Sequence, residues 1–301
     1  MVLVILAALA AVTAWLVYGI TRPPRKAYLV TPITFSQVTG PILKAKDETW
    51  DNHDGTKARG WLIRGAEGAP AVILLHRYGT DRSWLLNLAV KLNETTNFTV
   101  LWPDLRGHGE NPLVNWTMFG AVEGDDTAAA IDYLHSLKST SGKPQIGGGI
   151  GLYGVEMGAY SALDAAMRHQ DVRALGLDSV PASPDDVTRE ATNLRVTISN
   201  GMVQRLALWG IKTYAFGKYR DTPSCELARG LANKRVLLMA GEASDPWRPS
   251  TSALANCFGG GSAVELKLNL PVTGFNLPAS TGEQEERYDR PVIDFFDKAL
   301  R

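Results

Sequence analysis

The sequence IGLYGVEMGAYSALDAAM, residues 150–167, decides the fold of this chain. Its apolar start, Ile150–Tyr153, predicts a short buried strand, and its end, Ala159–Met167, predicts a helix. The residues between them, Gly154-Val155-Glu156-Met157-Gly158, predict a sharp turn from strand to helix. Glu156 is therefore expected at the carboxyl end of a buried strand, on the side where open α/β sheets bind ligands.

Composition limits the classes of protein to which the chain can belong. Its 301 residues, 45% of them apolar, suit one large α/β domain with a small appendage. Basic and acidic residues number 31 each, so no charge excess favours nucleic acid as a partner. Two cysteines, Cys225 and Cys257, give neither a metal spacing nor a disulfide framework, and we expect buried thiols. The glycine triplets at 147–149 and 259–261 are expected to be loops, and their spacing does not match a phosphate-binding motif. We therefore expect no cofactor, and the cysteine spacing leads us to expect no metal.

The first part of the chain predicts a membrane anchor. Residues 2–20, VLVILAALAAVTAWLVYGI, carry no charge and would form a helix roughly 28 Å long, close to the thickness of a bilayer core. Trp15 and Tyr18 lie near its end, where an aromatic belt is expected. A cleaved signal peptide is the alternative, but it normally begins with a basic residue and has a shorter apolar core. We therefore expect a retained single-pass anchor over residues 1–21.

The residues after the anchor predict its orientation. Arg22, Arg25 and Lys26 follow it directly, and by the positive-inside tendency this flank and the soluble body lie in the cytoplasm. A proline-containing linker is expected over residues 22–42. The membrane is thus the first expected partner.

Residues 43–301 alternate between strand and helix signals, which predicts a mostly parallel sheet with helices on both faces. Strands are expected at 44–50, 58–63, 71–75, 98–102, 150–153, 174–177, 235–240 and 264–268, and helices at 83–92, 119–137, 159–167 and 291–300. Residues 183–230 break the alternation with helical pieces only. We interpret them as a helical cap of about 45 residues over the carboxyl ends of the strands.

Three motifs follow one another along the chain, LLHRYG at 74–79, PDLRGHG at 103–109 and GVEMG at 154–158. On these motifs, residues 43–301 resemble the α/β-hydrolases of the serine aminopeptidase and lipase-like branch. Besides the turn at Glu156, which resembles the nucleophile elbow G-x-S-x-G, residues 74–79 (LLHRYG) resemble the H-G-x-G segment of the oxyanion hole. Residues 103–109 (PDLRGHG) resemble the D-x-R-G-x-G turn. The resemblance implies an α/β-hydrolase fold and a triad of Ser, acid and His in that order along the chain.

Carried over residue by residue, this triad is incomplete. Glu156 stands at the position of the nucleophilic Ser. Asp245 stands at the acid position, in a loop one residue longer than the usual pattern. Phe275 or Asn276 stands at the position of the His, and no His follows His169.

The oxyanion half of the site depends on backbone N–H groups, which tolerate changes of side chain. The resemblance assigns this role to Tyr78 and Met157. We expect Glu156 to fold toward these donors or to pair with Arg77, which stands where the family has Gly. Either arrangement would close the site. His76 and His108 neighbour the site, and in this family such residues hold loops by hydrogen bonding.

Two functions remain open from the sequence. One is a membrane-anchored pseudo-hydrolase that binds a small apolar ligand or serves as an accessory subunit of a membrane assembly. The alternative is an active hydrolase of ester, amide or related bonds with a non-standard site around Glu156 and Asp245, assisted by His76 or His108. A carboxylate can act as a nucleophile. However, the relatives with Asp at the elbow also use the late His, which is absent here.

Overall fold

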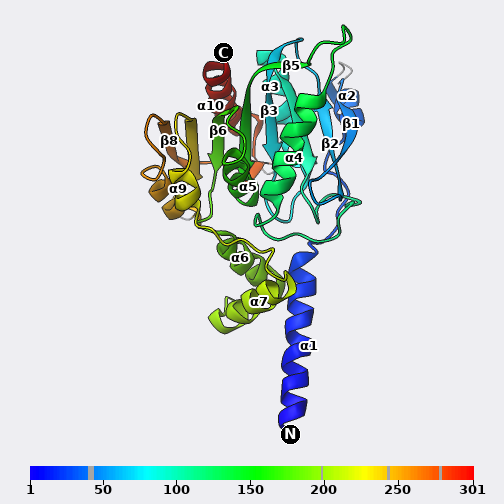
Figure 1. Ribbon diagram of the computed structural model, residues 1–301, viewed down its shortest axis with the longest axis vertical. Helices are drawn as coiled ribbons and strands as arrows, with labels where there is room; N and C mark the ends of the chain where they lie inside the picture. The colour runs from blue at the N-terminus through cyan, green and yellow to red at the C-terminus, as the bar shows by residue number, and fades with distance from the viewer. Residues whose placement is uncertain (40–43, 198, 243–244, 278–279) are drawn as a thin grey trace.

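The computed structural model describes residues 1–39, 44–197, 199–242, 245–277 and 280–301. Its centre is one eight-stranded sheet in the order β1-β2-β4-β3-β5-β6-β7-β8 (Figure 1). The strands are β1 (Lys46–Asp51), β2 (Lys57–Ile63), β3 (Ala69–Leu75), β4 (Thr99–Asp104), β5 (Ile146–Val155), β6 (Val172–Asp178), β7 (Arg235–Gly241) and β8 (Ala263–Leu270). β2 is antiparallel to β1 and β4, and every other neighbouring pair is parallel. The expected mostly parallel sheet is confirmed.

Helices cover both faces of the sheet, because the buried strands are apolar on both sides. In β3, Ala71, Ile73 and Leu75 belong to one hydrophobic core, while Val72 and Leu74 belong to the other. The first core lies under α4 and α5, and the second lies under α3 and α10. The covering elements are η1 (Arg82–Leu85), α3 (Leu86–Thr96), α4 (Glu123–Ser136), α5 (Met157–Ala166), α9 (Arg248–Leu254) and α10 (Gly282–Leu300).

Three local expectations differ from the structure. The helix expected from residue 119 begins only at Glu123, because Phe119 and Gly120 take positive φ and the Glu123 carboxylate accepts hydrogen bonds from the N–H groups of Met118 and Gly120. The glycines at 147–149 lie in β5 rather than in a loop; a Cβ at Gly147 would lie 2.8 Å from the Gly68 carbonyl oxygen. The expected linker contains a helix, α2 (Pro32–Thr39), and its boundary at 42/43 falls outside the described residues.

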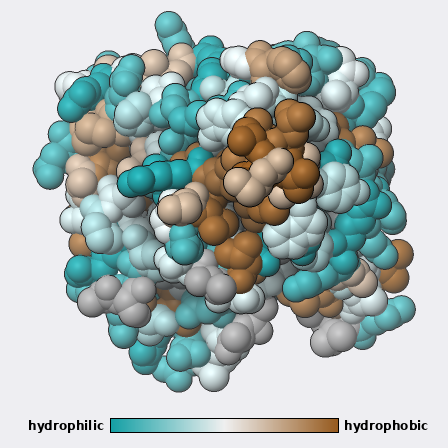
Figure 2. Space-filling view, turned by 90° about the horizontal axis from the view of Figure 1, so that it is seen from below, coloured by the Kyte–Doolittle hydropathy of each residue, from teal (hydrophilic) through white to brown (hydrophobic). Residues whose placement is uncertain are grey.

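The region between β6 and β7 is helical, in agreement with the expected cap. It comprises α6 (Pro184–Val196), α7 (Gly201–Tyr214) and α8 (Ser224–Arg229). The N-terminal helix α1 (Val2–Thr21) is long and apolar enough to cross a membrane. It projects from the body on the side of the cap, with α6 and α7 beside its C-terminal half (Figure 1). Apolar side chains gather on the face of the molecule from which α1 emerges (Figure 2).

A disulfide joins Cys225 on α8 to Cys257, which follows α9. The expectation of two buried thiols is therefore wrong. The two residues are 32 positions apart, and the Cα–Cα distance of 5.2 Å lies within the normal range for a bridged pair. Sequence spacing could not indicate the pairing, because the fold of the cap brings the two segments together.

Candidate functional site

The turn at Glu156 has the strained backbone of an elbow. β5 ends at Val155, Glu156 takes φ 50° and ψ −108°, and α5 begins at the next residue. A Cβ at Gly154 would lie 2.3 Å from the Gly158 carbonyl oxygen, and one at Gly158 would lie 2.3 Å from that of Leu75, so both glycines are required. Such a backbone conformation costs on the order of 1–3 kcal/mol in a non-glycine residue, so the packing around Glu156 must enforce it.

The side chain of Glu156 occupies the two backbone donors expected to form the oxyanion hole. Its Oε2 atom accepts hydrogen bonds from the N–H of Tyr78 at 2.8 Å and from the N–H of Met157 at 3.3 Å. Only 2% of Glu156 is exposed. The expected contact is therefore present. A substrate oxyanion could reach these donors only after the carboxylate had moved away.

Burial dominates the ionisation of Glu156. It raises the pKa of this carboxyl from its ordinary 4.5 to about 7, against the lowering effects of the Arg77 charge and of the two backbone hydrogen bonds. The charge of Glu190 on α6 raises the pKa further. Near neutral pH, the carboxyl group therefore exchanges between its charged and neutral forms.

Arg77 lies near Glu156 without forming an ion pair with it in the described part of the chain. Its guanidinium carbon lies 4.7 Å from the ring centroid of Phe275 and 5.1 Å from that of Trp84. Its Nη1 donates a hydrogen bond to the Tyr78 carbonyl at 3.2 Å. The guanidinium thus acts on Glu156 through space, and its stacking against Phe275 fixes it beside the elbow.

His76 and His108 hold loops, as expected. In His76, Nδ1 donates a hydrogen bond to the Arg77 carbonyl at 2.8 Å and Nε2 accepts one from the N–H of Leu105 at 3.0 Å. In His108, Nδ1 donates to the Arg106 carbonyl at 2.9 Å and Nε2 accepts from the N–H of Gly79 at 3.0 Å. Burial lowers the pKa of His76 to about 4 and that of His108 to about 3. Both rings are neutral at physiological pH, and both nitrogens of each ring are engaged.

Asp245 lies at the expected acid position, after β7. Its Oδ2 accepts a hydrogen bond from the N–H of Gly241 at 2.7 Å, and its Oδ1 accepts one from the N–H of Trp247 at 2.9 Å. The carboxylate therefore stabilises the loop in which it lies by binding backbone N–H groups on both sides of it. The two residues directly before it, 243 and 244, lie outside the described residues.

A second acid, Asp178 at the end of β6, was not singled out from the sequence. It is fully buried and accepts hydrogen bonds from the Tyr288 hydroxyl and from the N–H of Gly274 at 2.6 Å. The Ser179 hydroxyl lies 2.8 Å from Asp178 and 3.2 Å from Asp245, so it links the two carboxylates. Burial raises the pKa of Asp178 to about 6. The only signal in the sequence was a carboxylate that ends an apolar strand.

The loop at the His position brings Phe275, rather than Asn276, toward the elbow. Gly274 packs on the residue before Glu156, since a Cβ there would lie 2.4 Å from a methyl carbon of Val155. The side chain of Asn276 is exposed and folds back to accept a hydrogen bond from the N–H of Thr273 at 2.8 Å. A pocket of about 260 Å³ lies beside this loop and is lined by Asp245, Phe275 and Asn276 among others.

The end of α1 covers the site from the cap side. The Tyr78 hydroxyl donates a hydrogen bond to the Ile20 carbonyl at 2.7 Å, and the N–H of Thr117 donates one to the Thr21 carbonyl at 2.9 Å. Ile20 is fully buried and Leu16 almost so. The apolar helix is therefore part of the body's core at its C-terminal end, a feature that its sequence did not indicate.

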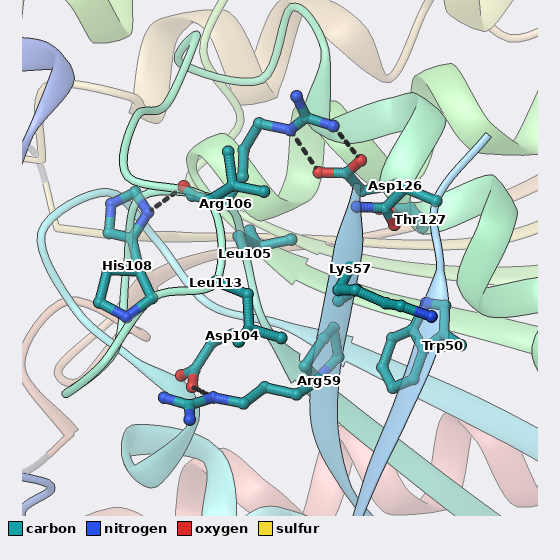
Figure 3. A pocket seen from close by; sticks show the side chains of 15 residues that line it. Trp50, Lys57, Arg59, Asp104, Leu105, Arg106, His108, Leu113, Asp126 and Thr127 are labelled. Atoms are coloured by element: carbon teal, nitrogen blue, oxygen red, sulfur yellow. Dashed lines mark hydrogen bonds and ion pairs between the residues drawn. The ribbon is translucent and has the colours of Figure 1, made fainter. Parts of the chain in front are cut away.

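The pocket in Figure 3 is separate from the elbow. It lies between β2 and the loop after β4, and Glu156 is not among its lining residues. Arg106 pairs with Asp126 on one side of it and Arg59 with Asp104 on the other (Figure 3). Its volume of about 20 Å³ leaves room for roughly one water molecule. We interpret it as part of the support beneath the D-x-R-G-x-G turn. Among the described residues, no cluster of His, Cys, Asp or Glu could hold a metal ion.

Comparison with solved structures identifies the fold. An esterase of Pyrococcus furiosus, Pf2001, is similar with a TM-score of 0.69 and 19% identity over 94% of this chain and 100% of that chain. An esterase of Thermogutta terrifontis has a TM-score of 0.57 and 20% identity over 86% and 100% of the two chains. A dienelactone hydrolase of Anabaena variabilis has a TM-score of 0.57 and 14% identity over 86% and 100%. No family model and no curated protein sequence matches the chain. The chain has the α/β-hydrolase fold, as its motifs predicted.

Proposed function

We propose that this chain is a membrane-anchored protein with an α/β-hydrolase fold that acts by binding rather than by hydrolysis. The observation that carries the proposal is the position of the Glu156 carboxylate on both donors of the expected oxyanion hole. In an active esterase those donors receive the oxyanion that forms when the substrate carbonyl is attacked. Here a side chain of the protein itself takes that place.

The histidines of the chain support the same proposal. A hydroxyl or water nucleophile needs a base within hydrogen-bond reach. Of the five histidines, His76 and His108 are buried and fully engaged, and His53, His135 and His169 lie near the carboxylates of Asp132 and Asp171, in the loops and helices away from the elbow. The proposed role is therefore that of an accessory subunit of a membrane assembly, or of a binder of a small apolar ligand.

A second candidate, an active hydrolase with a non-standard site, is favoured by two observations. The pKa of Glu156 is raised to about 7, which is close to the value suited to acid–base catalysis at neutral pH. The acid loop at Asp245 borders a pocket of about 260 Å³. Two of the structural neighbours are named esterases, but they resemble this chain in fold only.

Wild-type protein is expected to show no esterase activity above background. Short-chain aryl esters and a fluorophosphonate probe would be incubated with the wild type and with Glu156→Ala, in parallel. Because neither protein has a Ser at the elbow or a base beside it, both should hydrolyse the esters at the rate of buffer and remain unlabelled. Turnover by the wild type at least tenfold above Glu156→Ala would favour the second candidate, with Glu156 as its reactive group.

The anchor is proposed to remain on the protein. A signal peptide leaves after cleavage, whereas the last turns of α1 fill the core above the elbow and bond to Tyr78 and Thr117. A Cβ at Gly210 of α7 would lie 2.6 Å from a methyl carbon of Thr13, so the cap is also shaped to fit α1. Removal of α1 would expose this apolar surface to water.

The body is proposed to lie on the oxidising side of the membrane, in place of the cytoplasm. Disulfides persist in oxidising compartments and are rare in the cytosol, and Cys225 is bridged to Cys257. The basic flank that favoured the cytoplasm has structural contacts. The Arg22 guanidinium lies over the Tyr18 ring at 4.3 Å, and Arg25 donates a hydrogen bond to Asn115 at 2.6 Å. These contacts explain why Arg22 and Arg25 are basic, whichever side of the membrane the body lies on.

Thiol labelling tests the orientation. Membranes isolated in the presence of a blocking maleimide should yield protein in which both cysteines are unmodified, and a polymer-linked maleimide should add twice only after reduction. Cys225→Ser with Cys257→Ser is the control that should not shift at all. Two blocked thiols before reduction would instead place the body in a reducing compartment and restore the cytoplasmic orientation.

A further inference from the structure

The cap helix α7 presents two different faces. On one face Ala207, Gly210 and Ile211 are buried against the protein. A Cβ at Gly210 would lie 2.6 Å from Thr13 and 2.7 Å from Val17, so α7 crosses α1 in close contact at this level. The helix is therefore fixed in position relative to the proposed anchor.

The other face of α7 carries large apolar side chains in the open. Met202 is 80% exposed, Trp209 62% and Phe216, just beyond the helix end, 89%. Their spacing of seven residues places Met202 and Trp209 on one side of the helix, and Phe216 follows two residues after the helix end, where its φ is 45°. These three residues form what we call the apolar stripe. Exposed apolar groups of this size that cluster on one element mark an interaction surface.

The apolar stripe continues the lipid-facing surface expected of α1. The exposed large side chains of α1 run from Val2 to Val12 and include Trp15 and Tyr18 further on. α7 lies beside α1 and in contact with it (Figure 1). A surface that meets the bilayer along α1 therefore extends sideways onto the cap.

The depth of α7 agrees with an in-plane position. From Val2, Thr13 lies about 17 Å and Val17 about 23 Å along α1 at 1.5 Å per residue. In a hydrocarbon core about 30 Å thick, with Val2 at the far surface, the crossing point lies roughly 7–13 Å below the near surface. In-plane amphipathic helices bury their apolar face by about 5–10 Å. The two depths overlap.

Basic side chains lie over aromatic rings of α1 near the crossing, and long basic side chains at such a depth can extend toward the headgroups. The Arg195 guanidinium lies over the Trp15 ring at 4.6 Å, and that of Arg22 lies over the Tyr18 ring at 4.3 Å. Arg205, on α7, and Lys218, two residues after Phe216, are exposed. Aromatic and basic side chains are the usual anchors of interfacial helices.

We propose that α7 is a second membrane element, an in-plane helix whose apolar stripe is buried in the leaflet through which α1 leaves the bilayer. The occupant of this surface is lipid of that leaflet. The cap and the carboxyl ends of the sheet strands would then rest against the membrane, so that the candidate site faces ligands that come from the bilayer. The inference rests on the proposed anchoring by α1, and the experiment distinguishes the two.

Depth-dependent quenching tests the inference on the full chain in phosphatidylcholine vesicles. The native cysteines are bridged, so a single added cysteine can carry an environment-sensitive dye. Trp209→Cys reports on the apolar stripe, Val4→Cys on α1, and Glu94→Cys, which is exposed on α3 on the opposite side of the body, is the matched control. Vesicles with lipids spin-labelled near the headgroup end of the acyl chain should quench the dye at 209 several-fold more than at 94.

Each quenching pattern has one interpretation for α7 and for α1. Lipid quenching at 209 and at 4, with aqueous iodide quenching only at 94, supports the in-plane helix. Lipid quenching at 4 together with iodide quenching at 209 overturns the inference and leaves the anchor intact. Iodide quenching at both 209 and 4 overturns the anchoring itself, and the inference with it.

Discussion

Glu156→Ser combined with Phe275→His is expected to hydrolyse short-chain aryl esters at least about 100-fold faster than either single variant. A positioned general base contributes typically 10²- to 10⁴-fold. Ser at 156 alone lacks a base, and His at 275 alone lacks a nucleophile. In the single variant Glu156→Ser, the N–H groups of Tyr78 and Met157 would be free of the carboxylate, but the hydroxyl would remain poorly activated.

The choice of residue 275 follows from the loop after β8. Phe275 stacks on Arg77 beside the elbow, whereas Asn276 is exposed and bonds back to Thr273. Both Asp178 and Asp245 lie at the base of this loop or near it, joined through Ser179, and one of them could orient an imidazole.

The matched control is Glu156→Ser with Asn276→His, which carries the same residue types one position further along. It should stay near the rate of Glu156→Ser alone. Rates would be measured as kcat/KM, with fluorophosphonate labelling of the elbow peptide as an independent readout. A fast Glu156→Ser single variant would reveal another base, and a faster 276 variant would show that our placement of the loop is wrong.

The sequence predicted those features of the fold that are local in the chain. Apolar runs with period two or 3.6 identified the strands and most helices, because burial on both faces of a parallel sheet leaves a continuous apolar signal. The elbow at Glu156 was recognisable because its strand, turn and helix are contiguous. The hydrogen bonds that Glu156 accepts from the N–H groups of Tyr78 and Met157 were also predicted from the sequence, since backbone donors persist when side chains change.

The features that sequence reasoning missed join residues far apart in the chain. Asp178 and Tyr288 are 110 residues apart, and no periodicity links them. The bridge between Cys225 and Cys257 depends on how α8 packs near α9. The burial of Ile20 above the elbow was hidden because an apolar residue in an apolar helix looks the same whether it faces lipid or protein.

The stability of the protein is expected to depend on pH through Glu156. In the folded protein its pKa is about 7, against an ordinary 4.5 in the unfolded chain. Between these values the folded state keeps a proton that the unfolded state has released, so the free energy of unfolding falls as pH rises. The stabilisation is complete below about pH 4.5 and is lost as pH passes through about 7. A shift of this size corresponds to about 3 kcal/mol.

The most direct test of the claim that Glu156 is buried on the backbone donors is urea unfolding of the full chain in mild detergent, from pH 5 to pH 8, for the wild type and Glu156→Gln. Other buried carboxyls, such as Asp178, are common to both proteins and cancel in the difference. We expect the wild type to lose about 2–3 kcal/mol of stability relative to Glu156→Gln as the pH rises. Parallel pH profiles would contradict it, because a carboxylate in open solvent has the same pKa in the folded and unfolded chain.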